Sequence, residues 1–385
     1  MEFDLKTGLV VIGIALLPVY AFPSGGVQPA HLLLGLLATL YLLEWRWPRD
    51  QWAQSFGLLV CFVFAVESVY VIDGGDPRYL INAAYFAFNC IVATAIVLYC
   101  DDEGPEGVVR GVMIASAVTL VTIVTQGFDL QTFSEPGRLT GSFNNPNQLG
   151  FFSVCLLAMT FSFYRKKLVG YHVALALFTT SLLVSILSLS KAAMVSNFAV
   201  IGLAAAPRLS KKHVVAIFTV IAVFIGSTIS NIGVPMLEEL TFVSRLAGML
   251  GEQDSSLASR GYLAFLEGNT LQWVFGLGAE NVQNIIGHEV HSTLGSVFTE
   301  YGLVGAGLFG SVLVLWILRI VRGYGPIGVV CIVTPPMLYG LTHNGTRFTI
   351  FWILFGVSLS LANRAEGHTL ANDRRGAIDK TPRTG

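Results

Sequence analysis

Long runs of apolar residues dominate this sequence of 385 residues. A helix crosses the hydrocarbon core of a bilayer with about 20 apolar residues, or about 17 at the short end. Reading apolar runs against the polar breaks between them predicts an all-α, polytopic integral membrane protein with about twelve transmembrane helices. The predicted spans are 7–22, 29–43, 55–71, 80–100, 108–126, 147–163, 169–187, 192–206, 213–230, 293–318, 325–342 and 348–362.

The composition excludes most other classes of protein. Hydrophobic residues make up 54% of the chain and charged residues 12%, whereas soluble domains carry about 25% charged residues. A soluble globular enzyme and a disordered protein are therefore both excluded. The 23 Lys and Arg residues nearly balance the 24 Asp and Glu residues, and the formal net charge is -1. Because there is no basic excess, we expect no nucleic-acid partner.

Local signals fix two of the helix boundaries. A continuous helix over 169–206 would be about 57 Å long, nearly twice the hydrocarbon thickness of about 30 Å. We therefore expect a break near Ser188-Leu189-Ser190-Lys191. Asparagine is a good N-cap and proline suits the first helical position, so Asn145 and Pro146 predict the start of the span at 147.

Lysine and arginine collect on one side of the predicted spans. With the N-terminus inside, seventeen of the 23 basic residues fall in inner loops or in the C-terminal tail. The six on the outside are Arg78, Arg138, Lys191, Arg245, Arg260 and Arg347. Because positively charged loops stay in the cytoplasm, this bias predicts that both termini are cytoplasmic.

The connections divide the chain into four parts. Residues 1–230 contain the first nine predicted spans, and residues 293–362 contain the last three. Between them, 231–292 form a long outer loop, and the polar residues 363–385 predict a disordered cytoplasmic tail.

The outer loop has a pattern of its own. Apolar residues at helical spacing between Met236 and Leu250 predict an amphipathic helix in the membrane interface. A second helix is predicted from Ser255 to Trp273, after which Gly276-Leu277-Gly278 breaks the chain.

Three outer cations form the candidate binding site. Arg260 lies on a predicted interfacial helix, Lys191 in the tight break between two spans, and Arg138 just before a span. Guanidinium groups bind phosphate oxygens bidentately and lysine acts as a point charge, so three converging cations suit a diphosphate. The alternative is that each cation pairs with an acid or reaches lipid headgroups.

Other polar residues fall near the same side of the predicted membrane. A neutral imidazole at His291, where a span begins, could take a proton from a sugar hydroxyl; alternatively, it bonds only to backbone. His288 lies three residues before His291, but no third ligand has convincing spacing, so no metal site is expected. Glu67 is an intramembrane acid near the outer end of its span, where an outer cation is a candidate partner. His343 and Arg347 lie in the last outer loop and could line the same cleft.

Five segments in order along the chain resemble the bacterial O-antigen ligase and O-antigen polymerase superfamily. They are RLTGSFNNPNQLG at 138–150, SLSKAAM at 188–194, SRGYLAFLEGN at 259–269, FGLGAEN at 275–281 and HSTLGSVFTEYGLVGAGLF at 291–309. The resemblance covers residues 130–310 and extends to the rest of the chain through topology alone. It implies a GT-C-like membrane glycosyltransferase in the bacterial inner membrane, with an active site that faces the periplasm.

The resemblance also implies roles for individual residues. The loop arginine of the superfamily falls on Arg260, its essential histidine on His291, and the arginine of its other S-R motif on Lys191. The implied reaction transfers a glycan from undecaprenyl diphosphate to an acceptor without metal, nucleotide or other cofactor. Lys191 and Ser292 depart from the pattern, since arginine and asparagine are frequent there, and both departures weaken an assignment to the ligase branch.

The predicted function is polymerisation of lipid-linked repeat units of O-antigen or exopolysaccharide by inverting transfer. The expected partners are an undecaprenyl-diphosphate-linked oligosaccharide, an acceptor glycan, membrane lipid and, by resemblance, a chain-length regulator. One alternative is an O-antigen ligase that transfers the glycan to lipid A–core. A more distant alternative is a polysaccharide or lipid transporter, which predicts internal repeats and charges near the bilayer midplane. The sequence has no clear repeat, and its outer cations lie at span ends.

Overall fold

The computed structural model describes residues 4–22, 26–46, 48, 50–77, 79–126, 139–205, 268–287 and 290–378. The helices in these residues are α1 (Leu5–Ala15), α2 (Pro29–Leu43), α3 (Gln51–Ile72), α4 (Tyr79–Asp102), α5 (Glu106–Gln126), α6 (Pro146–Arg165), α7 (Tyr171–Leu187), α8 (Lys191–Ala205), α12 (Thr270–Phe275), α13 (Ala279–Ile286), α14 (Thr293–Tyr324), α15 (Pro326–Gly328), the π-helical turn η3 (Val329–Val333), α16 (Thr334–Gly340), the 3-10 turn η4 (Gly345–Arg347) and α17 (Thr349–Ile378).

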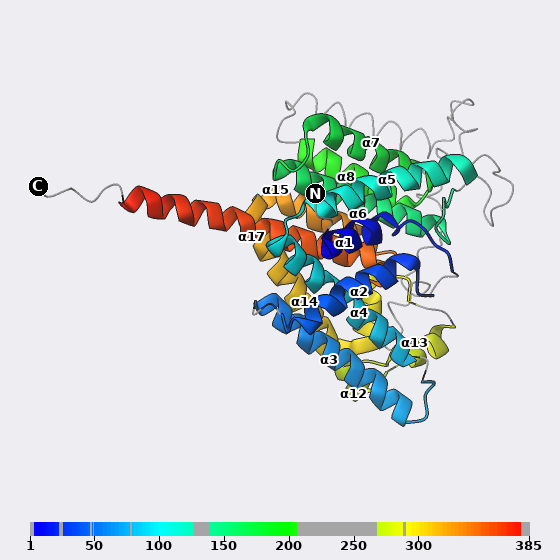
Figure 1. The fold of residues 1–385 in the computed structure, drawn as a ribbon. Coiled ribbons are helices and arrows are strands. Elements are labelled where there is room, and N and C mark those ends of the chain that lie inside the picture. Colours follow the sequence, from blue (N-terminus) through cyan, green and yellow to red (C-terminus); the bar gives the residue numbers. More distant parts are fainter. Residues whose placement is uncertain are drawn as a thin grey trace, which may run out of the picture.

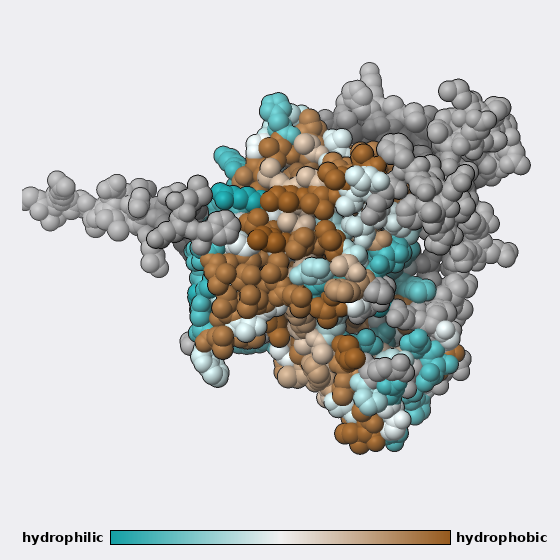
Figure 2. Space-filling model, turned by 45° about the vertical axis from the view of Figure 1, so that its right-hand side comes forward, coloured by the Kyte–Doolittle hydropathy of each residue, from teal (hydrophilic) through white to brown (hydrophobic). Residues whose placement is uncertain are grey.

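The described chain is that of a multi-pass membrane protein. Helices α3, α4, α5, α6 and α14 are long and apolar enough to cross a bilayer. Shorter apolar helices lie among them: α1, α2, α7, α8, the run from α15 to α16, and the first half of α17. Figure 2 shows a broad apolar band on the surface with hydrophilic residues at its borders, as expected for side chains that face lipid.

The all-α prediction is confirmed for the residues that the structure describes, which contain helices and no strands. Within them, each predicted span overlaps one of these apolar helices. The range 213–230 and the predicted loop helix 236–250 lie outside the described residues, as does most of the helix predicted over 255–273. The described end of that last range corrects the prediction: α12 begins only at Thr270, because Asn269 caps it by accepting from the Gln272 amide. The total of twelve spans stays a prediction.

Helix α17 passes through the middle of the helix bundle. It packs against α4, α6 and α14, with α5, α7 and α8 to one side and α3 and α12 to the other (Figure 1). Aromatic side chains from α3, α14 and α17 fill the core between these helices, and the indole of Trp316 donates to Ser358 Oγ at 2.9 Å. We call the end at which α2, α6, α8, α14 and α17 begin the outer end, and the opposite end the inner end.

Ion pairs and hydrogen bonds join the helices at the inner end. The Lys6 ammonium lies 2.6 Å from the Glu44 carboxylate, and Arg46 makes a two-pronged contact with Asp102. Lys166, just beyond α6, donates to the Gly323 carbonyl at 3.1 Å. Burial, together with the neighbouring Arg165, lowers the pKa of Lys166. These contacts connect α1, α2, α4, α6 and α14 on the side predicted to face the cytoplasm.

Helix α17 is longer than predicted. The sequence predicts a span that ends at residue 362 and a disordered tail from 363, whereas the helix continues to Ile378 over 30 residues. At 1.5 Å per residue it is about 45 Å long, more than a bilayer core requires. Residues 365–378 contain three alanines and two arginines, which favour a helix, but also two glycines, which do not.

Candidate functional site

The break between α7 and α8 lies where the sequence predicts it and places Lys191 at the start of a helix. Helix α7 ends at Leu187, and Leu189 adopts a left-handed backbone with φ 47° that reverses the chain. Lys191 is then the first residue of α8 and is half-buried. The positive end of a helix dipole lies at its N-terminus, so the ammonium and the helix both contribute positive potential here.

The segment before α6 packs against this break. The Leu139 amide donates to the Leu187 carbonyl at 3.2 Å, which joins the chain just after Arg138 to the end of α7. At the start of α6, Gly150 lies so close to Ser190 that an added Cβ would be 2.7 Å from the Ser190 Cβ. The outer ends of α6, α7 and α8 therefore meet next to Lys191.

The N-terminus of α6 has the predicted cap. The Asn145 side chain accepts a hydrogen bond from the Gln148 amide at 2.9 Å, and Pro146 occupies the first helical position. This confirms the boundary that the sequence predicts. An asparagine cap contributes about 1 kcal/mol to helix stability and fixes where the helix begins.

His291 is exposed and lies two residues before α14. Ser292 caps this helix by accepting from the Gly295 amide at 2.8 Å. The Thr293 hydroxyl donates to the His343 carbonyl at 3.2 Å and accepts from the Gly345 amide at 2.9 Å. The start of α14 is thus joined to the loop between α16 and α17, which carries His343.

The same loop contacts the first turn of α6. The Tyr339 hydroxyl donates to the Asn147 carbonyl at 2.8 Å, and its ring centroid lies 4.9 Å from that of His343. A Cβ at Gly345 would lie 2.7 Å from the Phe151 ring. Arg347 is exposed on η4, just before α17. Contacts therefore run from the Lys191 break through α6 to the loop of His343 and Arg347, and on to the start of α14.

Helix α14 has a kink at which the end of the long loop docks. Gly302 has φ 61° and ψ -162°, which are not helical values. In the turn before the kink, the Thr299 carbonyl accepts from the Leu277 amide at 2.9 Å, and the Glu300 carbonyl accepts from the Gly278 amide at 3.0 Å. A helix kink leaves backbone carbonyls that need new partners. Here the chain between α12 and α13 supplies them.

The docking brings two backbone segments too close together for side chains. Gly276 has φ 98°, and a Cβ on it would collide with the Glu300 carbonyl. A Cβ on Gly302 would in turn collide with the Gly276 amide. The Tyr70 hydroxyl, on α3, donates to the Gly276 carbonyl at 2.7 Å and attaches the segment to a third element.

Glu67 lies beneath the docked segment and is fully buried. Its carboxylate accepts from the Ala279 amide at 3.2 Å, at the first residue of α13, and lies near Tyr301. An acid at the positive end of a helix dipole is stabilising. The contacts with Ala279 and Tyr301 connect Glu67 to the loop and to α14.

Replacing Glu67 by alanine is expected to loosen α13. The Ala279 amide would lose a buried acceptor, which costs about 1–3 kcal/mol. Hydrogen exchange at the amides of 279–283 should accelerate about 5-fold or more, and Glu67→Gln should give an intermediate rate. Gln54→Ala changes an exposed position on α3, the helix that carries Glu67, and should leave exchange at 279–283 unchanged. Equal exchange in Glu67→Ala and wild type would show that the carboxylate does not hold this helix.

The structure thus connects the positions of Lys191, His291, His343 and Arg347 through contacts at the outer end, and it places Glu67 under α13. Arg138, Arg260 and His288 lie outside the described residues. Sequence analysis missed α13, Tyr339 and the pairing of Gly276 with Gly302; the two glycines, separated by 26 positions, carried no visible signal.

Among the described residues, no group of three or more His, Cys, Asp and Glu side chains could hold a metal ion. No protein-family model matches this sequence, and no curated protein matches it either.

Proposed function

We propose that this chain is a glycosyltransferase of the bacterial inner membrane that acts on the periplasmic side. It moves a glycan from undecaprenyl diphosphate to an acceptor sugar hydroxyl and polymerises repeat units of O-antigen or exopolysaccharide. Its active site lies at the outer end, with both termini in the cytoplasm. One observation carries the proposal: the outer end gathers the break that bears Lys191 and the segment that bears His291 around the first turn of α6.

Packing between the segments that resemble the O-antigen superfamily supports this proposal. Residues 139–150 contact the 187–190 break. Residues 276–278 bond to the first turns of α14, within 291–309. A resemblance spread over distant segments supports a common site better when those segments touch one another.

The electrostatics of Lys191 support an anionic leaving group. A cation at the first position of a helix adds to the positive potential of the helix N-terminus. An anion such as a diphosphate would be attracted there by both the ammonium and the helix amides. Arg260 and Arg138 complete the proposed set of diphosphate ligands.

The proposed reaction is a single inverting displacement. The acceptor hydroxyl oxygen forms a bond to the anomeric carbon while His291 takes the hydroxyl proton. The bond between the anomeric carbon and the diphosphate oxygen breaks, and its electron pair leaves with undecaprenyl diphosphate. Lys191, Arg260 and Arg138 stabilise the negative charge that develops there. Donors held in place for such charge contribute about 10²–10³ in rate each.

Lys191→Ala should lower kcat by about 10²–10³-fold, because the leaving diphosphate loses one positive partner. Lys191→Arg should retain most of the rate, since it keeps the charge. The assay uses the purified chain and the lipid-linked oligosaccharide that accumulates in a host from which this gene is deleted. Products are separated on gels with and without added lipid A–core.

The product pattern and a control variant decide the outcome. Ladders without lipid A–core support polymerisation, whereas a product that needs lipid A–core identifies a ligase. No transfer by the folded wild-type protein would overturn the proposal and favour transport. Arg110→Ala removes an exposed cation on α5 and should leave kcat unchanged. A full rate in Lys191→Ala would remove this lysine from the site.

A further inference from the structure

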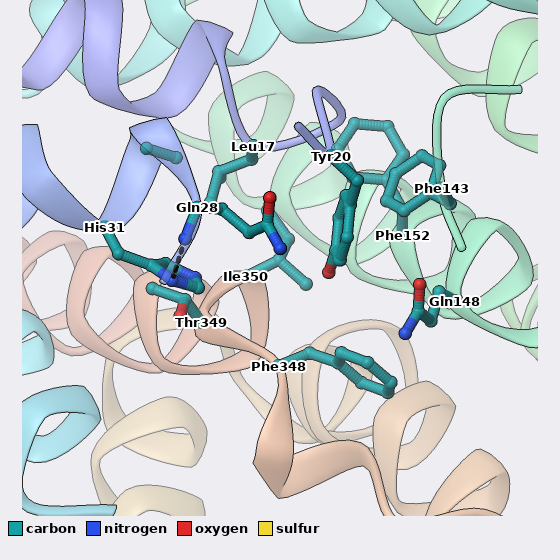
Figure 3. A pocket seen from close by; sticks show the side chains of 11 residues that line it. Leu17, Tyr20, Gln28, His31, Phe143, Gln148, Phe152, Phe348, Thr349 and Ile350 are labelled. Atoms are coloured by element: carbon teal, nitrogen blue, oxygen red, sulfur yellow. Dashed lines mark hydrogen bonds between the residues drawn. The ribbon is translucent and has the colours of Figure 1, made fainter. Parts of the chain in front are cut away.

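A small cavity lies at the outer end, apart from the Lys191 break. Its walls come from the end of α1, the start of α2, the segment that leads into α6, and the start of α17 (Figure 3). The cavity volume is about 20 Å³, enough for one water molecule or for one group of similar size. Aromatic rings of Tyr20, Phe143, Phe152 and Phe348 form much of the wall.

The polar wall on the α2 side is held rigidly. The Gln28 side chain accepts from the Ala21 amide at 2.9 Å and the Phe22 amide at 3.1 Å. It donates to the Phe22 carbonyl at 3.0 Å and the Gly26 carbonyl at 3.2 Å. Across the cavity, the Gln148 side chain accepts from the Asn144 amide at 3.1 Å. Because these side chains are fixed by backbone bonds, the cavity is formed before any ligand enters.

His31 contributes a neutral imidazole to the wall. Its Nδ1 accepts from the Gln28 amide at 3.0 Å, so Nδ1 carries no proton. Nε2 then carries the proton and donates to the Tyr85 hydroxyl at 3.1 Å. None of the described residues that line the cavity is an Asp, Glu, Lys or Arg. The cavity is therefore polar and uncharged, which suits a hydroxyl group and does not suit a phosphate.

Tyr20 provides a hydrogen-bonding group that points into this space. Figure 3 shows its hydroxyl directed into the cavity between Gln28 and Phe348. Among the described residues, this hydroxyl makes no hydrogen bond. The Tyr20 ring packs against the Phe143 ring, with centroids 5.2 Å apart, and this packing fixes the position of the Tyr20 hydroxyl. A phenol that faces a rigid cavity can donate a hydrogen bond to an incoming group and accept one from it.

We propose that this cavity receives one hydroxyl group of a sugar in the transferred glycan, hydrogen-bonded to Tyr20 and flanked by aromatic rings. The inference rests on the proposed function and adds a neutral sugar subsite to its diphosphate site. Phe348 belongs to the wall of this neutral cavity, and the residue directly before it in the chain is the cation Arg347.

Hydrogen exchange with two ligands tests both sites separately. The purified chain is measured alone, with undecaprenyl diphosphate, and with the lipid-linked oligosaccharide from the deletion host. We expect both ligands to slow exchange at residues 187–193, around Lys191. Only the oligosaccharide should slow exchange at 17–22 and 26–31, beside the cavity.

The possible outcomes separate the two proposals. Protection of 187–193 by both ligands, with equal exchange at 17–22 in all samples, overturns the sugar subsite alone. Protection of 17–22 by undecaprenyl diphosphate also overturns it, because that ligand has no sugar. Protection of neither region by either ligand overturns the diphosphate site together with the subsite that depends on it.

Tyr20→Phe removes only the hydroxyl and keeps the ring. The variant should raise KM for the lipid-linked oligosaccharide about three- to tenfold, the effect of one hydrogen bond, while kcat stays within twofold. Tyr171→Phe, at an exposed position on α7, is the matched control and should leave both constants unchanged. An unchanged KM in Tyr20→Phe, with an unchanged melting temperature, would mean that the cavity holds an ordered water only.

Discussion

His291→Ala is expected to lower kcat for glycan transfer by about 10²–10⁴-fold, the contribution of a positioned general base. The imidazole lies at an exposed position two residues before α14, and in the proposed reaction it meets the acceptor hydroxyl there. The helix cap belongs to Ser292, so His291→Ala leaves this cap unchanged. The measurement is single-turnover transfer with the lipid-linked oligosaccharide, which separates chemistry from product release.

A base can be distinguished from a merely structural residue by chemical rescue. Added imidazole should restore part of the rate in His291→Ala but should not affect the wild type. His172→Ala, at an exposed position on α7, is the control and should keep the full rate. Full turnover in His291→Ala without imidazole would exclude His291 as the base.

Gly276→Ala should detach the end of the long loop from α14. The new Cβ would collide with the Glu300 carbonyl, and the backbone φ of 98° is unfavourable for alanine. The bonds from the Leu277 and Gly278 amides and from the Tyr70 hydroxyl would weaken together. We expect a loss of about 2–4 kcal/mol in local stability, from strain and three hydrogen bonds. Limited proteolysis between residues 268 and 287 should accelerate.

Gly287→Ala is the matched control for this variant. Gly287 also has a positive φ, 74°, but nothing lies within 4 Å of where its Cβ would be. Gly287→Ala should therefore lose only about 1 kcal/mol of stability, from the backbone strain of an alanine at positive φ. If both variants are cleaved equally fast, the collision with α14 has no effect and the docking is not what holds this segment.

Features that depend on neighbours in sequence could be predicted from the sequence. The all-α class, the break at 188–191 and the Asn145 cap follow from local rules about apolar runs and helix ends, and all three agree with the residues that the structure describes. The same local rules failed at the tail, because a low content of apolar residues says little about whether a helix continues past the membrane.

Features that depend on distant pairs could not be predicted in this way. Gly276 and Gly302 each look like ordinary loop or helix glycines, and only their close approach explains both. Glu67 can be identified from the sequence as an unusual acid within a span, yet its partner Ala279 lies 212 positions away in the chain. Four separate segments line the cavity beside Tyr20, and no spacing within one segment indicates that Tyr20 could bind a sugar.

Leu189 has a consequence for how the lysine meets its anion. A left-handed leucine costs about 1–2 kcal/mol, and a side chain that is only 5% exposed offsets this through burial worth about 1.5–3 kcal/mol. The corner is thus set during folding and does not wait for a substrate. For the proposed diphosphate ligand, the ammonium would already be in position, so little ordering entropy would be lost on encounter and more of the attraction would be retained as affinity.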